Sequence, residues 1–186
     1  MISSSEKIVQ SKYKNKAIFL DRDGVINHLV SRDHGFYSPR YLKDFMIYSD
    51  VKEFIRFFKK KQYYIIIISN QPDISRGKMK IEELNSIDRF LNEKLDIDEI
   101  RYSFDSQVTD GGSKKPSAKM VFEAQNKWNI DLSKSYFLGD SLVDIECAKN
   151  ANIFFILVRR EHNQEIEYPY CVNSLNDVHK MINNTI

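Results

Sequence analysis

The sequence predicts an α/β protein: a Rossmann-like, three-layer α/β/α domain around a central parallel sheet of five to six strands. Short apolar segments of strand length, rich in β-branched and aromatic residues, alternate along the chain with segments whose apolar residues recur at helical spacing. Strands that alternate with helices form parallel sheets through right-handed crossovers, and the helices cover both faces. The length of 186 residues suits one such domain, with no large cap domain, over residues 1–186.

The elements follow in order from the apolar spacing and the flanking residues. Strands are expected at residues 17–20, 63–68, 100–104, 135–138 and 153–158, with a sixth at 170–172. Helices are expected after Asp50 as a cap, from Gly77, over 117–128, through Ala148 and over 175–182. Residues 27–48 are too long for a tight connection and form a small flap, and residues 105–114 form a polar loop.

Composition narrows the function classes. The formal net charge is only +2 and the lysines are dispersed apart from residues 59–61, which argues against a nucleic-acid partner. Cys147 and Cys171 have no disulfide or zinc spacing, so we expect a cytoplasmic protein. The apolar run at residues 65–68 is far too short to cross a membrane. Residues 1–15 are polar and are expected to form a flexible segment without a signal peptide.

Two carboxylates follow the first strand directly. In an extended chain residues i and i+2 point the same way, so Asp21 and Asp23 are expected to face one site with Arg22 turned aside. The carboxyl ends of the strands are where open α/β sheets bind their ligands. Two carboxylates so close repel each other, and a hard cation with oxygen ligands relieves that repulsion.

Polar residues also follow later strands. Ser69 and Asn70 end the second strand, Asp140 and Asp144 follow the fourth, and Lys115 precedes a helix between them. We expect all of these groups at one edge of the sheet. An oxygen-rich site selects magnesium. A magnesium ion and a lysine together stabilise the negative charge of phosphoryl oxygens, so the site suits phosphoryl transfer. There one carboxylate can attack phosphorus to form an aspartyl phosphate, while a second carboxyl group transfers protons.

Four segments, in order, resemble the motifs of the haloacid dehalogenase (HAD) superfamily. They are residues 21–27 (DRDGVIN), 69–71 (SNQ), 115–116 (KP) and 139–144 (GDSLVD). Within the superfamily, residues 21–27 and 69–77 (SNQPDISRG) resemble the branch of D-glycero-D-manno-heptose 1,7-bisphosphate phosphatases and histidinol-phosphate phosphatases. The resemblance implies a magnesium-dependent phosphatase of a small phosphorylated metabolite, foremost a sugar phosphate, and we expect a monomer.

The resemblance implies roles for the matching residues. Asp21 matches the nucleophile and Asp23 the general acid/base. Ser69, with Asn70 beside it, matches the phosphate-binding motif, and Lys115 matches the lysine that offsets the charge of phosphate and nucleophile.

The same resemblance implies a set of magnesium ligands. Asp140 matches the ligand, together with Asp21 and the backbone carbonyl of Asp23, while Asp144 supports Lys115 or Asp140 from behind.

The sequence departs from that branch at one loop. The branch has a zinc loop of three cysteines and a histidine before an Arg-Lys-Pro triplet, whereas residues 106–113 contain neither residue type. No zinc is therefore expected. Lys114 stands where the branch has arginine, and it and Arg76 are expected to bind substrate. Further candidates for a second anionic group are three side chains outside the motifs: Arg32, His34 and Arg40.

Several alternatives stay open. The substrate could be histidinol phosphate or a nucleic-acid 3′-phosphate, or the chain could be a phosphate-binding module that has lost catalysis. Three histidines, His28, His162 and His179, have no partners at metal-ligand spacing and are interpreted as surface residues.

Overall fold

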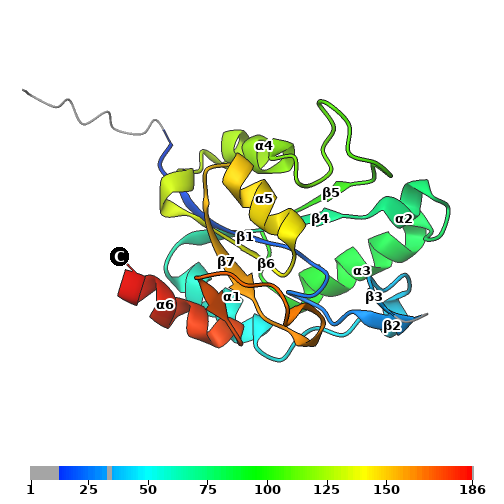
Figure 1. The fold of residues 1–186 in the computed structure, drawn as a ribbon, viewed down its shortest axis with the longest axis horizontal. Coiled ribbons are helices and arrows are strands. Elements are labelled where there is room, and N and C mark those ends of the chain that lie inside the picture. Colours follow the sequence, from blue (N-terminus) through cyan, green and yellow to red (C-terminus); the bar gives the residue numbers. More distant parts are fainter. Residues whose placement is uncertain (1–12, 33–34, 186) are drawn as a thin grey trace, which may run out of the picture.

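The chain folds into a six-stranded parallel sheet with helices on both faces (Figure 1). The computed structural model describes residues 13–32 and 35–185. The strands are β1 (Lys16–Leu20), β4 (Tyr63–Asn70), β5 (Glu99–Ser103), β6 (Tyr136–Gly139), β7 (Phe154–Val158) and β8 (Cys171–Val172), in the order β5-β4-β1-β6-β7-β8. The helices are α1 (Val51–Lys60), α2 (Pro72–Ser75), α3 (Ile81–Lys94), α4 (Lys119–Trp128), α5 (Leu142–Asn150) and α6 (Val178–Thr185). The predicted fold class is confirmed.

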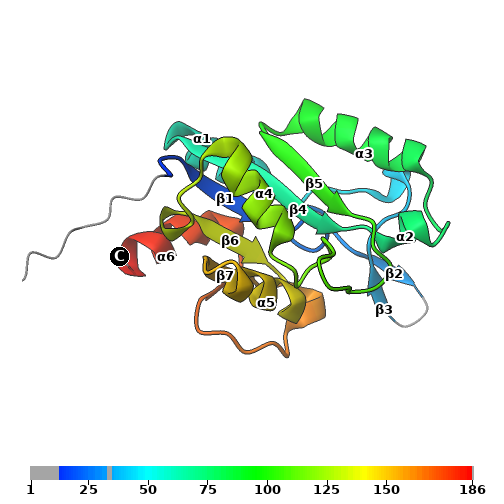
Figure 2. The ribbon, with the colours of Figure 1, turned by 90° about the horizontal axis from the view of Figure 1, so that it is seen from above.

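Side chains of β1 alternate between two separate cores. Ile18 and Leu20 pack in a core with α1, α3 and α6, whereas Ala17 and Phe19 pack in a second core with α4 and α5 (Figure 2). Successive side chains of an extended strand point to opposite faces, so a central strand covered on both faces must be apolar throughout. The four consecutive isoleucines at residues 65–68 of β4, all fully buried, meet that requirement.

The boundary of α3 differs from the prediction. The helix begins at Ile81 rather than near Gly77, because Gly77 has a φ of +68° and ends the turn after α2. Glycine adopts this left-handed conformation without the steric cost that a side chain adds. The apolar spacing of α3 was assigned correctly for Leu84 and Leu91, which are buried.

Asp50 occupies the N-cap position of α1, as predicted, but its side chain has another role. Asp50 precedes the helix, but no hydrogen bond caps the helix through its side chain. Its carboxylate instead accepts hydrogen bonds from Ser174 Oγ at 3.0 Å and Leu175 N at 2.9 Å, and so ties α1 to the segment before α6.

The N-terminal expectation is tested only at its end. Asn15 N donates to Asn129 O at 3.0 Å and Asn15 O accepts from Asp131 N at 2.7 Å, so this residue is held against the domain. Residues 1–12 of the expected flexible segment lie outside the described residues. In the described part of the chain, no helix has the length and apolar character needed to cross a membrane.

The expected flap is a small hairpin. Strands β2 (Val30–Arg32) and β3 (Gly35–Tyr37) pair antiparallel beside the main sheet (Figure 1). Short 3-10 helices follow at Leu42–Asp44 and, later in the chain, at Leu132–Lys134, Glu161–Asn163 and Leu175–Asp177. His34 lies outside the described residues. Among the residues that are described, the chain inserts between β1 and α1 only the hairpin, the 3-10 helix Leu42–Asp44 and their flanking loops, and no large cap is present.

Candidate active site

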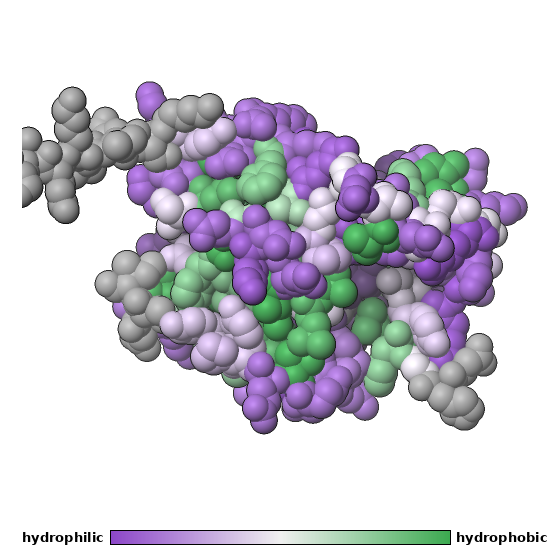
Figure 3. Space-filling model, turned by 45° about the horizontal axis from the view of Figure 1, so that its top comes forward, coloured by the Kyte–Doolittle hydropathy of each residue, from purple (hydrophilic) through white to green (hydrophobic). Residues whose placement is uncertain are grey.

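A cavity of about 330 Å³ lies at the carboxyl ends of β1, β4 and β6. Its polar lining contains seven of the predicted residues: Asp21, Asp23, Ser69, Asn70, Lys115, Asp140 and Asp144. Apolar side chains of Leu29, Phe36 and Val143 form part of its wall. Figure 3 shows one face of the molecule, with hydrophobic patches beside a hollowed region of a mostly hydrophilic surface. A larger hollow of about 520 Å³ between α1 and the end of α3 is lined mainly by basic side chains and contains none of these residues.

Lys115 contacts two carboxylates in the wall of the cavity. Its Nζ lies 2.8 Å from Asp21 Oδ1 and 2.6 Å from Asp144 Oδ1, and the lysine is only 3% exposed. Burial acts to lower the pKa of Lys115, but the charges of Asp144 and Asp21 outweigh it and hold that pKa above its usual value. The lysine is therefore a fixed positive charge beside the first carboxylate of the motif.

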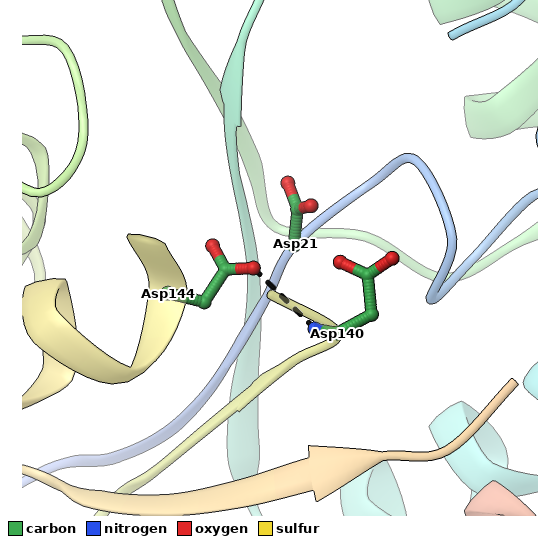
Figure 4. A group of neighbouring side chains, drawn as sticks. All are labelled: Asp21, Asp140 and Asp144. Atoms are coloured by element: carbon green, nitrogen blue, oxygen red, sulfur yellow. Dashed lines mark hydrogen bonds between the residues drawn. The ribbon is translucent and has the colours of Figure 1, made fainter. Parts of the chain in front are cut away.

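Asp140 brings a third carboxylate to the same point. Oxygen atoms of Asp21, Asp140 and Asp144 lie within 4.8 Å of one another. Figure 4 shows them reaching this point from the end of β1, the end of β6 and the first turn of α5. Asp144 Oδ2 also accepts a hydrogen bond from Asp140 N at 3.4 Å, so Asp144 contacts both Lys115 and Asp140.

The charges of this group favour a cation. Burial raises the pKa of Asp21 well above its usual value; Lys115 opposes this, and Asp144 and Asp140 add to it. Burial likewise raises the pKa of Asp140, against a hydrogen bond from His162. Three carboxylates facing one lysine leave an excess of negative charge in a buried place. A small divalent cation with oxygen ligands, such as magnesium, fits this donor set.

Asp23 lies in different surroundings. Its Oδ2 accepts from Gln71 Nε2 at 2.6 Å, its Oδ1 accepts from Asn27 Nδ2 at 3.0 Å, and both oxygens contact the guanidinium group of Arg22. The side chain of Arg22 is fully buried. The prediction that Arg22 turns aside from the pair of aspartates therefore misses its ion pair with Asp23.

The second motif positions other groups of the site. Asn70 Oδ1 accepts from Lys115 N at 2.9 Å, and Asn70 Nδ2 donates to Lys115 O at 3.2 Å. This pair of hydrogen bonds fixes the backbone that carries the catalytic lysine candidate. Ser69 is 1% exposed and its Oγ accepts from Gln71 Nε2 at 2.9 Å.

Gly24 allows the first and fourth motifs to approach each other. A Cβ atom at this position would lie 1.9 Å from Asp140 Oδ2, and the residue has a φ of +91°. Both the contact and the left-handed conformation exclude other residue types without local rearrangement.

Of the basic side chains that were predicted to bind substrate or a second anionic group, those that the structure describes are not among the residues that line the cavity. Arg76 Nη2 and Lys114 Nζ both donate to the carbonyl oxygen of Ser106, at 3.1 and 2.8 Å. Arg40 instead pairs with Asp73 at 2.7 Å.

Arg32, the remaining described candidate, stays within the hairpin. Its Nη2 donates to Ser38 O at 2.7 Å, and its guanidinium group lies over the ring of Tyr37 at 5.2 Å.

Residues 105–114 form a loop closed by hydrogen bonds. Asp105 Oδ2 accepts from Ser113 N at 3.0 Å and from the hydroxyls of Ser113 and Ser103, both at 3.1 Å. These hydrogen bonds, led by that of the Ser113 N–H group, lower the pKa of Asp105. A carboxylate and two serines thus join the two ends of this loop. The absence of zinc stays a prediction.

His162 was not predicted to belong to the site. Its Nε2 lies 2.5 Å from Asp140 Oδ2 and its side chain is only 12% exposed, so the interpretation as a surface residue was wrong. The ring of Phe36 in the hairpin lies 5.7 Å away. His162 follows β7, the neighbour of β6, so its place near a strand's carboxyl end was the signal that could have identified it. His28, by contrast, is exposed, as predicted.

Comparison with known proteins agrees with this geometry. Residues 29–152 match the haloacid dehalogenase-like hydrolases. A D-glycero-D-manno-heptose-1,7-bisphosphate 7-phosphatase of Chlorobaculum tepidum is 32% identical over 171 residues, which cover 81% of each chain. The D-glycero-beta-D-manno-heptose-1,7-bisphosphate 7-phosphatase of Yersinia pestis is 31% identical over 183 residues, with 89% of this chain and 94% of the relative covered.

A solved structure has the same fold. The D,D-heptose 1,7-bisphosphate phosphatase of B. bronchiseptica, complexed with magnesium and phosphate, superposes with a TM-score of 0.73 at 22% identity. The superposition covers 93% of this chain and all of the other. The chain therefore belongs to the haloacid dehalogenase-like hydrolases, as one of their phosphomonoester phosphatases.

Proposed function

We propose that this chain is a magnesium-dependent phosphatase that hydrolyses a small sugar phosphate through an aspartyl-phosphate intermediate, with D-glycero-D-manno-heptose 1,7-bisphosphate as the leading substrate. The observation that carries the proposal is the position of Lys115 between Asp21 and Asp144 in an open cavity, with Asp140 beside them. The proposal includes a monomeric, cytoplasmic protein.

Asp21 is the nucleophile in this proposal. Lys115 binds its Oδ1, so we assign the attack on phosphorus to Oδ2. The bond from phosphorus to the ester oxygen breaks, and Asp23 supplies the proton that this leaving oxygen needs. Water then attacks the phosphoryl group, its proton passes to Asp23, and Asp21 is released.

The remaining residues hold charge and geometry. Magnesium held by Asp21, Asp140 and the backbone carbonyl of Asp23 would supply positive charge for the phosphoryl oxygens. Lys115 stabilises the same negative charge, and Ser69 offers its hydroxyl group to a phosphoryl oxygen. Asp144 holds the ammonium group of Lys115, and Asn70 holds its backbone.

The second phosphate of a bisphosphate would bind near Arg76 and Lys114. Their side chains meet at one carbonyl oxygen, that of Ser106. Burial lowers the pKa of Lys114, and the charge of Arg76 lowers it further. A bound anion would relieve the repulsion between these two cations. Replacing Arg76 or Lys114 by alanine should raise KM for a bisphosphate about tenfold and leave KM for a monophosphate nearly unchanged.

Phosphate release from a panel of esters, with and without magnesium, tests the proposal. The panel contains heptose 1,7-bisphosphate, histidinol phosphate, hexose phosphates and an oligonucleotide 3′-phosphate. We expect magnesium-dependent release, fastest from the heptose bisphosphate. Faster release from histidinol phosphate or from the oligonucleotide would make that ester the assigned substrate in place of the heptose bisphosphate. Magnesium binding without hydrolysis of any ester would indicate a phosphate-binding module.

A further inference from the structure

The guanidinium group of Arg22 lies beneath Asp23, out of reach of solvent. Arg22 is fully buried, between the rings of Phe45 and Tyr102, whose centroids lie 5.7 and 5.6 Å from its Cζ atom. Arginine stays charged under all ordinary conditions, so a buried guanidinium group requires charged or polar partners.

One partner of Arg22 is the carboxyl group of Asp23. Nη2 lies 3.0 Å from Oδ2 and 3.2 Å from Oδ1, and Nε lies 3.3 Å from Oδ1. Two amides hold the same carboxyl group from other sides, Asn27 at Oδ1 and Gln71 at Oδ2. A planar fork of donors fixes the plane of a carboxyl group as well as its position, which one ammonium group cannot do.

The other side of Arg22 is held by two elements. Nη1 donates to the hydroxyl group of Tyr102 on β5 at 3.4 Å, and that hydroxyl group donates to Asp88 on α3. Burial raises the pKa of Asp88, against the hydrogen bond from Tyr102 and the charge of Arg22. Asp88, Tyr102 and Arg22 thus form a chain of contacts from α3 to the site, which ends at Asp23.

Stability alone does not account for this arrangement. A buried ion pair commonly stabilises a protein no more than apolar residues of similar volume would. The pair lies directly behind the carboxyl group that transfers protons in the proposed reaction. Proton transfer depends on distance and direction, so a fixed carboxyl group has an advantage there.

We propose that Arg22 is a positioning residue that orients the carboxyl group of Asp23 toward the ester oxygen, and that Tyr102 and Asp88 hold Arg22 in place. The inference rests on the proposed function, in which Asp23 is the proton donor. Arg22 itself makes no contact with the reacting atoms in this account.

Esters with different leaving groups test this role. An alkyl phosphate releases a basic alkoxide that needs a proton from Asp23, whereas p-nitrophenyl phosphate releases a stable phenolate that does not. The value of kcat/KM covers steps up to the first irreversible one, here the transfer to Asp21. We expect Arg22→Lys to lower kcat/KM for a hexose 6-phosphate at least about tenfold more than kcat/KM for p-nitrophenyl phosphate.

Two further variants guard against a folding defect. Tyr102→Phe removes a single oxygen atom and should shift the same ratio in the same direction, by about threefold. Arg101→Lys is the matched control, because Arg101 lies on the same strand but pairs with Glu99 and Glu123. It should leave the ratio unchanged, and thermal melting reports whether each variant is folded.

The possible results separate the two proposals. The positioning role alone would be overturned if Arg22→Lys lowered kcat/KM equally for both esters and Tyr102→Phe left the ratio of the two kcat/KM values unchanged. A wild-type chain that hydrolyses neither ester would overturn the proposed function and, with it, this inference.

Discussion

Asp21 and Asp23 are two residues apart and are equally buried, at 8% exposure each, yet the cations that they contact are held in different ways. Asp21 contacts Lys115, 94 residues later in the chain, and shares that lysine with Asp144. Asp23 contacts Arg22, its immediate neighbour, and this is the one carboxylate within 4.0 Å of that guanidinium group in the described part of the chain.

The two cations therefore depend differently on their aspartates: among the described residues, Lys115 has a second carboxylate partner, and Arg22 does not. Lys115 keeps Asp144 if Asp21 loses its charge, whereas Arg22 would keep a buried charge without a carboxylate if Asp23 did. A buried charge that loses its partner is strongly destabilising. The same substitution should therefore affect catalysis at both positions but stability mainly at Asp23.

The largest expected effect is that of Asp21→Asn on turnover. The variant lacks the attacking carboxylate, so we expect kcat to fall at least about 10³-fold. Its melting temperature should stay near that of the wild type, because Lys115 remains 2.6 Å from Asp144. Steady-state kinetics and thermal melting measure both, and normal turnover would remove Asp21 from the nucleophile role.

Asp23→Asn should combine a catalytic and a structural loss. We expect kcat for an alkyl phosphate to fall about 10²-fold or more, because proton transfer is lost. The free energy of unfolding should decrease by about 3 kcal/mol, because the amide offers the buried Arg22 guanidinium group one oxygen acceptor in place of two. Urea denaturation beside Asp21→Asn provides the comparison. Equal stability of the two variants would contradict the distinction between the two aspartates.

His162 contacts Asp140, which is an expected magnesium ligand together with Asp21. Removing the hydrogen bond to Asp140 Oδ2 in His162→Ala should weaken magnesium binding about tenfold, because groups behind a metal ligand fix its orientation. Titration calorimetry measures this directly. His28→Ala is the matched control, since the ring of His28 lies against Tyr48 instead. Unchanged magnesium affinity in His162→Ala would show that Asp140 does not need this contact.

The smallest effect concerns pH. Burial raises the pKa of Asp21 and that of Asp140, so protons compete with a cation at low pH. As the pH rises through the raised pKa values of these two residues in the folded protein, their carboxyl groups ionise. The metal-free protein then loses the stability that the protonated forms provide. Magnesium should therefore raise the melting temperature more at about pH 8 than at about pH 5.

In that melting experiment, two variants distinguish the contribution of the Asp21 carboxylate from that of the Asp23 carboxylate. Asp21→Asn should reduce the pH dependence of the magnesium effect, whereas Asp23→Asn, whose side chain is not an expected ligand, should retain it. A shift independent of pH in the wild type would argue against carboxylate ligation by these groups.

The Asp21 side of the site was predictable because regular structure brings it together. Strand ends of a parallel sheet meet at one edge, so Asp21, Ser69 and Asp140 could be placed together without coordinates. Lys115 could be added because it precedes the helix between two of these strands, and all four residues line the cavity. The alternation of buried residues along β1 and β4 followed from the same periodicity.

The contacts around Asp23 were less predictable. Alternation in a strand indicates that Arg22 points away from its neighbours, but it does not distinguish solvent from a buried place between two rings. His162 lies in a 3-10 turn and Lys114 in a loop, where no period fixes the direction of a side chain. Their contacts depend on tertiary packing.

The most direct test of the account is to locate the phosphoryl group during turnover. Asp23→Asn incubated with p-nitrophenyl phosphate and magnesium should form the intermediate and hydrolyse it slowly, so that it accumulates. Acid quenching, borohydride reduction and peptide mass mapping then identify the modified residue. The proposed reaction predicts a modified Asp21, and no modified residue in the variant that also carries Asp21→Asn. A phosphoryl group on another residue, or phosphate release without any modified residue in this variant, would contradict it.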